Sequence, residues 1–395
     1  MASLYKKPVF VADPRAGRKT KTKSKKWWGR YRDERGVERR VPLASDKTAA
    51  QTMLNALVVK EERKAAGIED PFEKHRKRPL AQHIDDFRSH LANKGSTTDH
   101  VNLTEQRIRD LVDACGFKLM GDIAADRVQR YLAEARVVTG EIMSATVAEW
   151  RRPGSSCRGA LVWFLRDLWP GAGWGLLDVT GRPKAAWWYF RRAAQPVTCA
   201  FTDEGVNGLA IHLYNDGPAP LAVQLDLTAW RNGEVEIARA SVPILLAPRS
   251  AETHRMDAYF EGFHDFGHVY RFGPPGHDVL GATLHEAATG HRIATAVQLP
   301  LGLARHLEDD LGLAATLQKR ADGWWACTVT TRRFAHAVHC DVPGWQPDDD
   351  YFALLPGQSQ LVLLRPCSAN AEPPQPRITA LNGRRTIKPL VSELP

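Results

Sequence analysis

The sequence predicts an α+β multidomain chain: a small sheet-and-helix domain, a helical segment, one βα unit and two β-sandwiches. Three observations predict this order: an uneven charge, a change in hydrophobic period along the chain, and a concentration of tryptophans. Residues 1–136 hold 30 Lys and Arg against 19 Asp and Glu, whereas residues 137–395 hold 24 against 26. Ten of the twelve tryptophans lie from Trp150 onward. We therefore expect two halves of different types.

Composition excludes several protein classes. With 395 residues, 43% apolar and 25% charged, the chain is an ordinary globular protein rather than a disordered one. It has no run of about 18 apolar residues, and its N-terminus lacks the apolar core of a secretory signal, so we expect a cytoplasmic protein without a membrane partner. The six cysteines show no CxxC spacing, which predicts neither a zinc site nor a disulfide framework. We expect no cofactor.

The first fifty residues carry most of the positive charge. Residues 1–24 read as a basic tail, and residues 25–70 as a domain with a β-hairpin in KWWGRYRDERGVERRVPL followed by a helix that Ser45 would cap. One hairpin face would carry Arg30, Arg32 and either Arg39 or Arg40, and such guanidinium groups suit phosphate and guanine recognition. A solvated face is the alternative. The candidate DNA-binding residues here are Lys25, Lys26, Trp28, Arg30, Arg32, Arg39 and Arg40.

A helical segment is expected over residues 75–136. The basic stretch before it adds Arg76, Lys77 and Arg78 to the candidate DNA-binding residues. A stripe of Leu80, Ile84, Phe87 and Leu91 predicts a core-facing helix that ends before Gly95. Two more helices follow, over about 97–115 and 123–136.

The order of these segments resembles the N-terminal portion of phage-type tyrosine recombinases, the integrases. The resemblance rests on KKWWGRYRDERGVERRVPLASDKTAAQ, DPFEKHRKRPLAQHIDDFRSHLANKGSTTDHV and CGFKLMGDIAADRVQRYLAE, and covers about residues 20–136. It implies an arm domain and a helical, SAM-like core-binding domain that contact DNA. The core-binding segment is cut short and the family's catalytic domain is absent. His268 and Arg271 fit His-x-x-Arg only by chance, since no helical flanks surround them.

Residues 137–195 are apolar and aromatic. Gly159 to Leu165 is a continuous apolar run bounded by turn signals, which predicts a fully buried parallel strand. The stretch from Gly181 opens a helix that runs through Arg192. A strand, a Trp-rich loop and a helix make one βα unit of a barrel.

This stretch resembles the last βα unit of a β-mannosidase of the family 2 glycoside hydrolases. The motifs GALVW, D-x-W-P, W-G-x-x-D and GRPK-A occur in the family's order within SSCRGALVWFLRDLWPGAGWGLLDVTGRPKAAWWYFRRAAQPV. The resemblance implies that Trp163 lines a sugar subsite and that Trp169 lies in the adjoining loop. The alternative is that both tryptophans fill a core.

Two antiparallel sandwiches are expected beyond Pro196, over residues 196–300 and 301–395. Short alternating runs recur about every ten residues, and the turns at 215–217 and 231–233 are of hairpin type. The phrases RRFAHAVH and DYFALLPG resemble the two C-terminal immunoglobulin-like domains of bacterial β-mannosidases.

Catalytic carboxylates are not found. A retaining glycosidase needs two carboxylates about 5 Å apart, and the resemblance places them on barrel strands that this sequence does not show. Glu141 and Glu149 belong instead to a helix before the last strand. Histidines at 285 and 291, and at 336 and 339, lack the spacing or the third ligand of a metal site. Asp348, Asp349 and Asp350 read as a solvated turn.

Three hypotheses follow. In the first, residues 1–136 bind DNA and the remainder is the non-catalytic end of a β-mannosidase, so turnover by this chain alone is not expected. In the second, the chain is a glycoside hydrolase that acts on β-mannosides. In the third, it is a fusion without a joint function, joined near residues 136–140, whose unpaired apolar strand makes it oligomeric or prone to aggregation.

Overall fold

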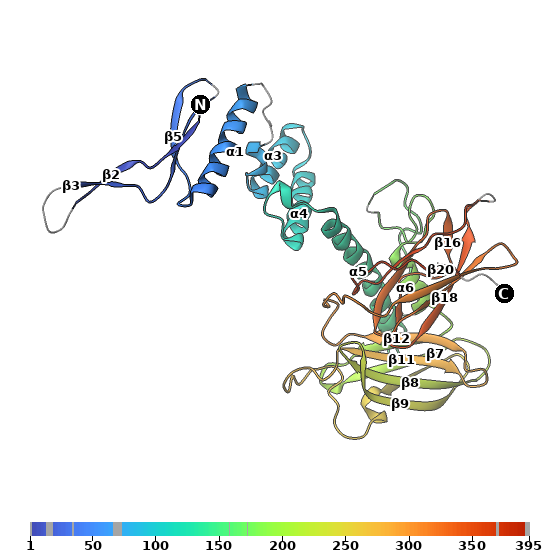
Figure 1. Cartoon of the computed structure of the whole chain (residues 1–395). Helices are drawn as coiled ribbons and strands as arrows, with labels where there is room; N and C mark the ends of the chain where they lie inside the picture. The colour runs from blue at the N-terminus through green and yellow to red at the C-terminus, as the bar shows by residue number, and fades with distance from the viewer. Residues whose placement is uncertain are drawn as a thin grey trace. The chain divides into compact units, whose positions relative to one another are not determined.

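The computed structural model describes residues 2–12, 19–33, 35–65, 73–157, 159–171, 173–368 and 371–391. The chain splits into two compact units, Met1–Ala125 and Asp126–Pro395. Figure 1 traces the chain in both. Within the described ranges, no helix is long and apolar enough to cross a membrane.

A three-stranded antiparallel sheet and one helix form the start of the N-terminal unit. The sheet has the order β1-β4-β5, and its elements are β1 (Ser3–Tyr5), β4 (Trp28–Arg32), β5 (Glu38–Pro42) and helix α1 (Lys47–Ala65). Leu43, Ala50 and Leu54 are buried between sheet and helix. The approach is close at Gly29, where a Cβ atom would lie 2.8 Å from a methyl group of Leu54. The predicted hairpin and helix are both present, but Asp46 rather than Ser45 caps α1: its carboxylate accepts a hydrogen bond from the backbone N–H of Ala49 at 2.8 Å.

The predicted basic tail differs from the structure. Residues 2–24 contain β1 and a two-stranded ribbon of β2 (Pro8–Ala12) and β3 (Lys19–Lys23). Strand β1 pairs with β4, with Tyr5 opposite Trp28, and so satisfies backbone groups on one edge of β4 that would otherwise be exposed. Alternation of lysine with β-branched threonine in KTKTK is also compatible with a strand.

In the helical segment, most helices begin and end close to the predicted residues. It contains α2 (Glu73–Arg76), α3 (Leu80–Asn93) and α4 (Thr98–Cys115). Thr97 caps α4 by accepting a hydrogen bond from the backbone N–H of His100, and Gly116 ends it with a φ of 65°. On α3, Leu80 and Ile84 are buried, whereas Phe87 is exposed.

Helix α5 is longer than predicted. It runs over Ala125–Arg151, so the junction expected near residues 136–140 lies inside one continuous helix. The helix itself contains no Pro, and the next proline along the chain is Pro153; the buried residues Val137, Val147 and Ala148 give its second half a core-facing side. Both Glu141 and Glu149 lie on this helix, as predicted.

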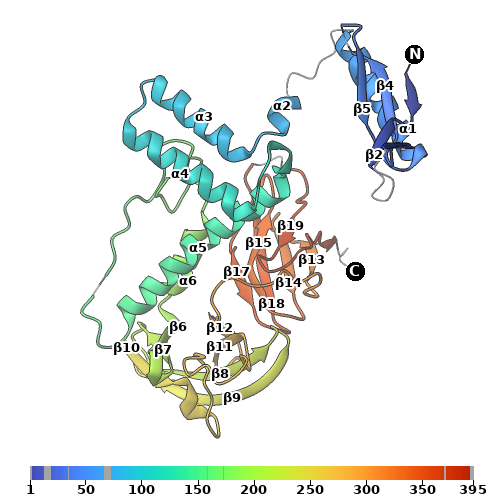
Figure 2. The same ribbon diagram turned by 90° about the vertical axis from the view of Figure 1, so that its left-hand side faces the viewer.

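The predicted barrel strand is absent. Residues 159–165 have no regular secondary structure, and the connection from α5 to α6 (Ala185–Ala193) is a long loop (Figure 2). A parallel strand requires hydrogen-bonded neighbours, and within the described part of this loop the only bridges pair Leu177 with Arg166 and with Pro183. The expected partial barrel unit is therefore a helix preceded by an exposed loop; the predicted helix is present.

The first sandwich packs a three-stranded sheet on a four-stranded one. The first has the order β10-β7-β6 and the second β12-β11-β8-β9. Their strands are β6 (Val197–Asp203), β7 (Leu209–Asn215), β8 (Leu221–Arg231), β9 (Val235–Leu246), β10 (Ser250–Arg255), β11 (Val279–Glu286) and β12 (Arg292–Gln298). Ile211, Leu213, Leu225, Leu227 and Leu284 lie in the core between the sheets.

The second sandwich has sheets of five and three strands, ordered β16-β18-β14-β13-β20 and β17-β15-β19. Their strands are β13 (Ala314–Lys319), β14 (Trp325–Thr330), β15 (Ala335–Asp341), β16 (Trp345–Pro347), β17 (Phe352–Leu354), β18 (Ser359–Pro366), β19 (Arg377–Thr379) and β20 (Leu390–Val391). Helices α5 and α6 pack on this sandwich through a buried cluster that includes Val137, Trp188, Ala337 and Tyr351.

Candidate functional site

Part of the predicted basic face is present on the β4–β5 hairpin. Arg30 lies directly opposite Arg40 in the register, so the two side chains project from the same face of the sheet. Trp28 and Arg32 share that face because they are two residues away from Arg30. Arg30, Arg32 and Arg40 are exposed. The structure thus places three arginines beside one half-buried tryptophan.

Arg39 is on the other face of the hairpin, opposite Tyr31. Its Nε atom donates to Asp33 over 2.8 Å, and this bond holds the pKa of the Asp33 carboxyl below its usual value. Arg40 is itself bound to Glu38 at 2.6 Å. Arg39 and Arg40, which the sequence left as alternatives, therefore lie on opposite faces of the hairpin, and Arg40 is the one beside Arg30.

The remaining predicted DNA contacts lie on other elements. Lys25 and Lys26 are exposed in the bend before β4, and Arg76 and Lys77 are exposed around the end of α2. Arg78 differs from them because its guanidinium group binds Asp86 at 2.5 Å and Gln82 at 2.9 Å. Its hydrogen bonds hold it against helix α3.

The predicted sugar-contact residues lie on the loop between α5 and α6. Trp163 is 75% exposed and Trp169 is 72% exposed, so neither fills a core in this structure. The Phe164 ring lies 5.5 Å from that of Trp163, and Trp174 adds a third indole that is 77% exposed. We call this aromatic stretch, residues 159–174, the tryptophan loop. Flat apolar rings of this kind can stack on the C–H faces of sugars.

A buried carboxylate anchors the tryptophan loop. Asp167 accepts a hydrogen bond from the backbone N–H of Gly175 at 2.7 Å and pairs with Lys184 at the start of α6. The bond from Lys184 holds the pKa of Asp167 below its usual value despite burial. Gly173 allows this packing, because a Cβ atom there would lie 2.8 Å from an Asp167 oxygen.

The carboxylates near the loop and on α5 are engaged in structural bonds. Asp178 accepts from the backbone N–H groups of Thr180 and Arg182, and Glu149 pairs with Arg152 at 3.1 Å. Asp167 is held as described above. We therefore assign these carboxylates to the architecture rather than to acid–base chemistry, which requires an acid and a nucleophile about 5 Å apart on either side of a glycosidic bond.

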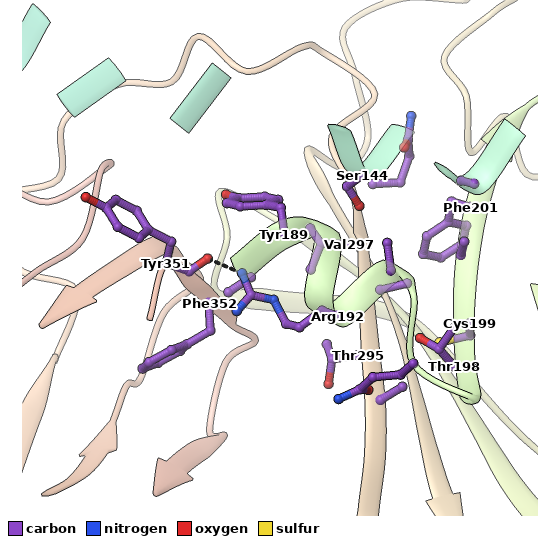
Figure 3. A pocket seen from close by; sticks show the side chains of 18 of the residues that line it. Ser144, Tyr189, Arg192, Thr198, Cys199, Phe201, Thr295, Val297, Tyr351 and Phe352 are labelled. Carbon is purple, nitrogen blue, oxygen red and sulfur yellow. Dashed lines mark hydrogen bonds between the residues drawn. The ribbon is translucent and has the colours of Figure 1, made fainter. Parts of the chain in front are cut away.

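A large cavity lies where helices α5 and α6 meet both sandwiches, and sequence reasoning missed it. Its volume is about 910 Å³. Ser144 of α5, Tyr189 and Arg192 of α6, Cys199 of β6 and Thr295 of β12 lie around it in Figure 3. These residues come from segments far apart in the sequence, and no motif connects them. Glu141, which the sequence placed on a helix before the last strand, also lines the cavity.

A polar network closes one side of this cavity. Glu141 accepts hydrogen bonds from the Tyr189 hydroxyl at 2.9 Å and from Nε2 of His336 at 2.7 Å. Burial and the neighbouring Glu141 carboxylate raise the pKa of Tyr189 well above its usual value. Arg192 pairs with Asp349 at 2.7 Å, so Asp349 is part of a domain contact. The expectation of a solvated turn is therefore wrong for Asp349 and for the buried Asp350, which binds His339, whereas Asp348 is exposed.

Metal binding finds no support in the described ranges. They contain no group of three or more His, Cys, Asp or Glu side chains that could hold an ion. His336 binds Glu141, and His339 binds Asp350 at 2.9 Å. Of the cysteines, Cys199, Cys327 and Cys340 are buried; burial raises the pKa of Cys199 to about 12.

No family model matches the chain. In sequence it is similar to β-mannosidase B of Thermothelomyces thermophilus, 33% identical over 84 residues, and to that of Aspergillus niger, 36% identical over 76 residues. These matches cover 20% and 18% of this chain and only 10% and 9% of the two relatives. The chain thus matches about one-tenth of the length of these curated relatives.

Solved structures show a similar fold. A β-D-mannosidase from Dictyoglomus thermophilum has a TM-score of 0.51 at 13% identity, over 65% of this chain and 30% of that one. An exo-chitosanase from Amycolatopsis orientalis has a TM-score of 0.50 at 15% identity, over 66% and 35%. The chain is therefore similar in part to β-mannosidases in sequence, and about two-thirds of it has a fold similar to that of these solved structures. These comparisons give no support to the integrase resemblance.

Proposed function

We propose that the C-terminal unit recognises carbohydrate, as part of the architecture of a glycoside hydrolase of the β-mannosidase type. The observation that carries this proposal is the tryptophan loop, in which Trp163 and Trp169 are more than 70% exposed while Asp167 fixes the loop to α6. Exposed aromatic rings on an anchored loop form a preorganised surface for a sugar ring. The similarity to β-mannosidases supports a mannoside as the sugar.

Hydrolysis is a separate step of the proposal. The similarity favours the glycoside hydrolase hypothesis over the DNA-binding fusion, and a full enzyme of this type would act on β-mannosides. In this chain, however, Asp167, Asp178 and Glu149 are engaged in structural bonds. We expect background release of nitrophenol from an aryl β-mannoside by the purified chain. Turnover that survives further purification would establish the hydrolase hypothesis instead.

Binding is tested by titrating the full chain with β-1,4-mannotriose in a calorimeter. Trp163→Ala and Trp169→Ala should each weaken binding, by about 10- to 150-fold if each ring contributes about 1.5–3 kcal/mol, the range for burying an apolar side chain. Trp150→Ala is the matched control, because Trp150 is an exposed tryptophan on α5 outside the loop. Equal affinities for all three variants and the unaltered chain would refute the assignment.

DNA binding by the N-terminal unit is the second candidate function. The observation that favours it is the register of the β4–β5 hairpin, which places Arg30, Arg32 and Arg40 on one exposed face. The excess of basic residues in 1–136 supports it. Such binding should weaken steeply with salt, because each neutralised phosphate releases counterions.

The test measures affinity for a 30-base-pair duplex over a series of salt concentrations. Replacing Arg30 and Arg40 by Ala should reduce the slope of log affinity against log salt by about 2, one for each phosphate contact. Arg39→Ala is the matched control, because Arg39 is on the opposite face and binds Asp33. Affinity that ignores salt would exclude this function.

A further inference from the structure

The core of the second sandwich contains two cysteines, one from each sheet. Cys327 lies on β14, the central strand of the five-stranded sheet, and Cys340 lies on β15, the central strand of the three-stranded sheet (Figure 2). Both side chains belong to the buried cluster that fills the space between the two sheets. The two cysteines therefore enter the same core from opposite sides.

The alternation of side chains along the two strands directs both thiols inward. On β14, Cys327 and Val329 are fully buried, whereas Thr330 is exposed. On β15, Cys340 is 3% exposed and Val338 is fully buried. Residues two apart on a strand share a face, so each cysteine lies on the face that packs against the other sheet.

The two thiols are in direct contact. The Cys340 thiol donates a hydrogen bond to the sulfur of Cys327. This bond lowers the pKa of Cys327, and together with burial it raises the pKa of Cys340 well above its usual value. Cys199 of the first sandwich is also buried, but its sulfur lies against the backbone carbonyl of Ala282 at 3.9 Å rather than against another thiol.

A covalent bond between these sulfur atoms would connect the two sheets. The sulfur atoms of a disulfide lie about 2 Å apart, and the hydrogen bond already brings the two thiols together without other atoms between them. The bond would also close the short connection between β14 and β15 into a loop, which restricts the unfolded chain and so stabilises the folded one. Cysteine spacing in the sequence did not predict this pair, because the packing of two sheets creates it.

We propose that Cys327 and Cys340 form a disulfide between the two sheets of the second sandwich when the chain folds in an oxidising solution. The thiolate of one cysteine attacks a small disulfide such as oxidised glutathione, and one glutathione leaves as a thiol. The other cysteine then loses its proton and attacks the protein sulfur of the mixed disulfide, and the second glutathione leaves. Two protein thiols are thereby oxidised, and one glutathione disulfide is reduced to two thiols.

Burial determines when this reaction takes place. Cys327 is fully buried and Cys340 is 3% exposed, and thiol–disulfide exchange requires access to the sulfur atoms. An oxidant therefore reaches them before the two sheets have packed, and a finished disulfide is shielded from reductants. The redox conditions during folding, rather than those that the folded chain meets later, determine the state of this pair. The proposal is independent of sugar and DNA binding.

The test refolds the full chain from denaturant, once with a mixture of oxidised and reduced glutathione and once with dithiothreitol. The changes Cys115→Ser, Cys157→Ser and Cys367→Ser remove the three cysteines that are not buried, so that they cannot form other disulfides. Alkylation in denaturant followed by peptide mapping should find Cys327 linked to Cys340 after oxidative refolding. After reductive refolding, both thiols should be alkylated.

Thermal unfolding of the two products measures the effect of the bond. The oxidised chain should unfold at a temperature about 5–15 °C above that of the reduced chain. Cys340→Ala should abolish this difference. Cys199→Ala is the matched control, because Cys199 is a buried cysteine on β6 of the first sandwich, and the difference should persist in it. The peptide map requires no change at Cys327 or Cys340, so it decides the question even if Cys340→Ala folds poorly.

The role of burial has its own measurement. Oxidised glutathione should leave both thiols of the native reduced chain intact under conditions in which it links them during refolding. The proposal is overturned if Cys327 and Cys340 are both alkylated after oxidative refolding, or if the difference in unfolding temperature persists in Cys340→Ala. Oxidation of the native chain as fast as that of the unfolded chain would also overturn it.

Discussion

His339 is a residue whose protonation should affect the stability of the second sandwich. Burial is the largest single effect and would lower the pKa of His339, but the hydrogen bond to Asp350 and the negative charges of the nearby carboxylates together outweigh it and raise the pKa above its usual 6.5. Asp341 acts in the same direction, whereas Arg136 of α5 opposes it. The imidazole ring also stacks on Tyr351 at 4.5 Å, so this group lies where the helices meet the sandwich.

We predict that the His339 contribution to stability decreases as pH rises above neutral. A raised pKa in the folded state means that the stabilisation is fully present below pH 6.5 and is lost as pH passes the folded-state value. The unfolding temperatures of the unaltered chain and of His339→Gln should therefore differ most below pH 6.5 and converge as the pH rises past the raised pKa of His339. A difference that grows with pH would contradict the assigned ion pair with Asp350.

Gly140 determines how closely helices α5 and α6 pack. It is buried in the middle of α5, and a Cβ atom there would lie 2.8 Å from Cγ of Tyr189 on α6. The contact is therefore between the helix backbone and an aromatic ring. Tyr189 is in turn held by Glu141 of α5 at 2.9 Å.

We predict that Gly140→Ala destabilises the chain, although the same change in an exposed helix stabilises by about 1 kcal/mol. Displacement of the Tyr189 ring should cost about 1–3 kcal/mol, measured by denaturant unfolding of the C-terminal unit within the chain. Gly276→Ala is the control within the C-terminal unit, because a Cβ atom there meets nothing within 4 Å. A more stable Gly140→Ala variant would show that α6 can move away without loss.

Elements with local signals were predictable, and those that depend on distant partners were not. Thr97 and Gly116 mark both ends of α4 in the sequence itself. The apolar run from Gly159 to Leu165 carries an equally clear strand signal, but a strand forms only where a neighbour supplies hydrogen bonds. The cavity was not predictable either, because Glu141 and His336 are 195 residues apart.

The two units of the whole chain differ in charge and in the support that the comparisons give them. The basic excess belongs to residues 1–136. The fold similarity covers 65% of the chain or more. Because Met1–Ala125 is less than a third of the chain, the similar region must include part of the C-terminal unit. Composition alone separated the two halves. The change in composition near residue 136 comes eleven residues after Ala125, where the first compact unit ends, because helix α5 (Ala125–Arg151) spans both positions without a break.

Exposed apolar side chains on the tryptophan loop should make the whole chain self-associate. Leu161 is fully exposed, and Leu165 and Leu168 are 59% and 69% exposed. The apolar run of residues 159–165 is of the kind usually found in a protein interior. Contiguous apolar surface of this kind is a site of protein association. Light scattering should therefore show an average mass that rises with protein concentration above that of the 44.0 kDa monomer.

Replacing these three leucines by Ser should lower that mass toward the monomer, because it removes apolar area without touching the Asp167 anchor. Leu245→Ser is the matched control: Leu245 is 67% exposed on strand β9, outside the loop, and its replacement should leave the association unchanged. Adding β-1,4-mannotriose should also reduce the association if a sugar bound to Trp163 covers part of the same surface. A single monomeric species at every concentration would show that the loop does not bind a second copy, and that its exposed rings are accessible to sugar alone.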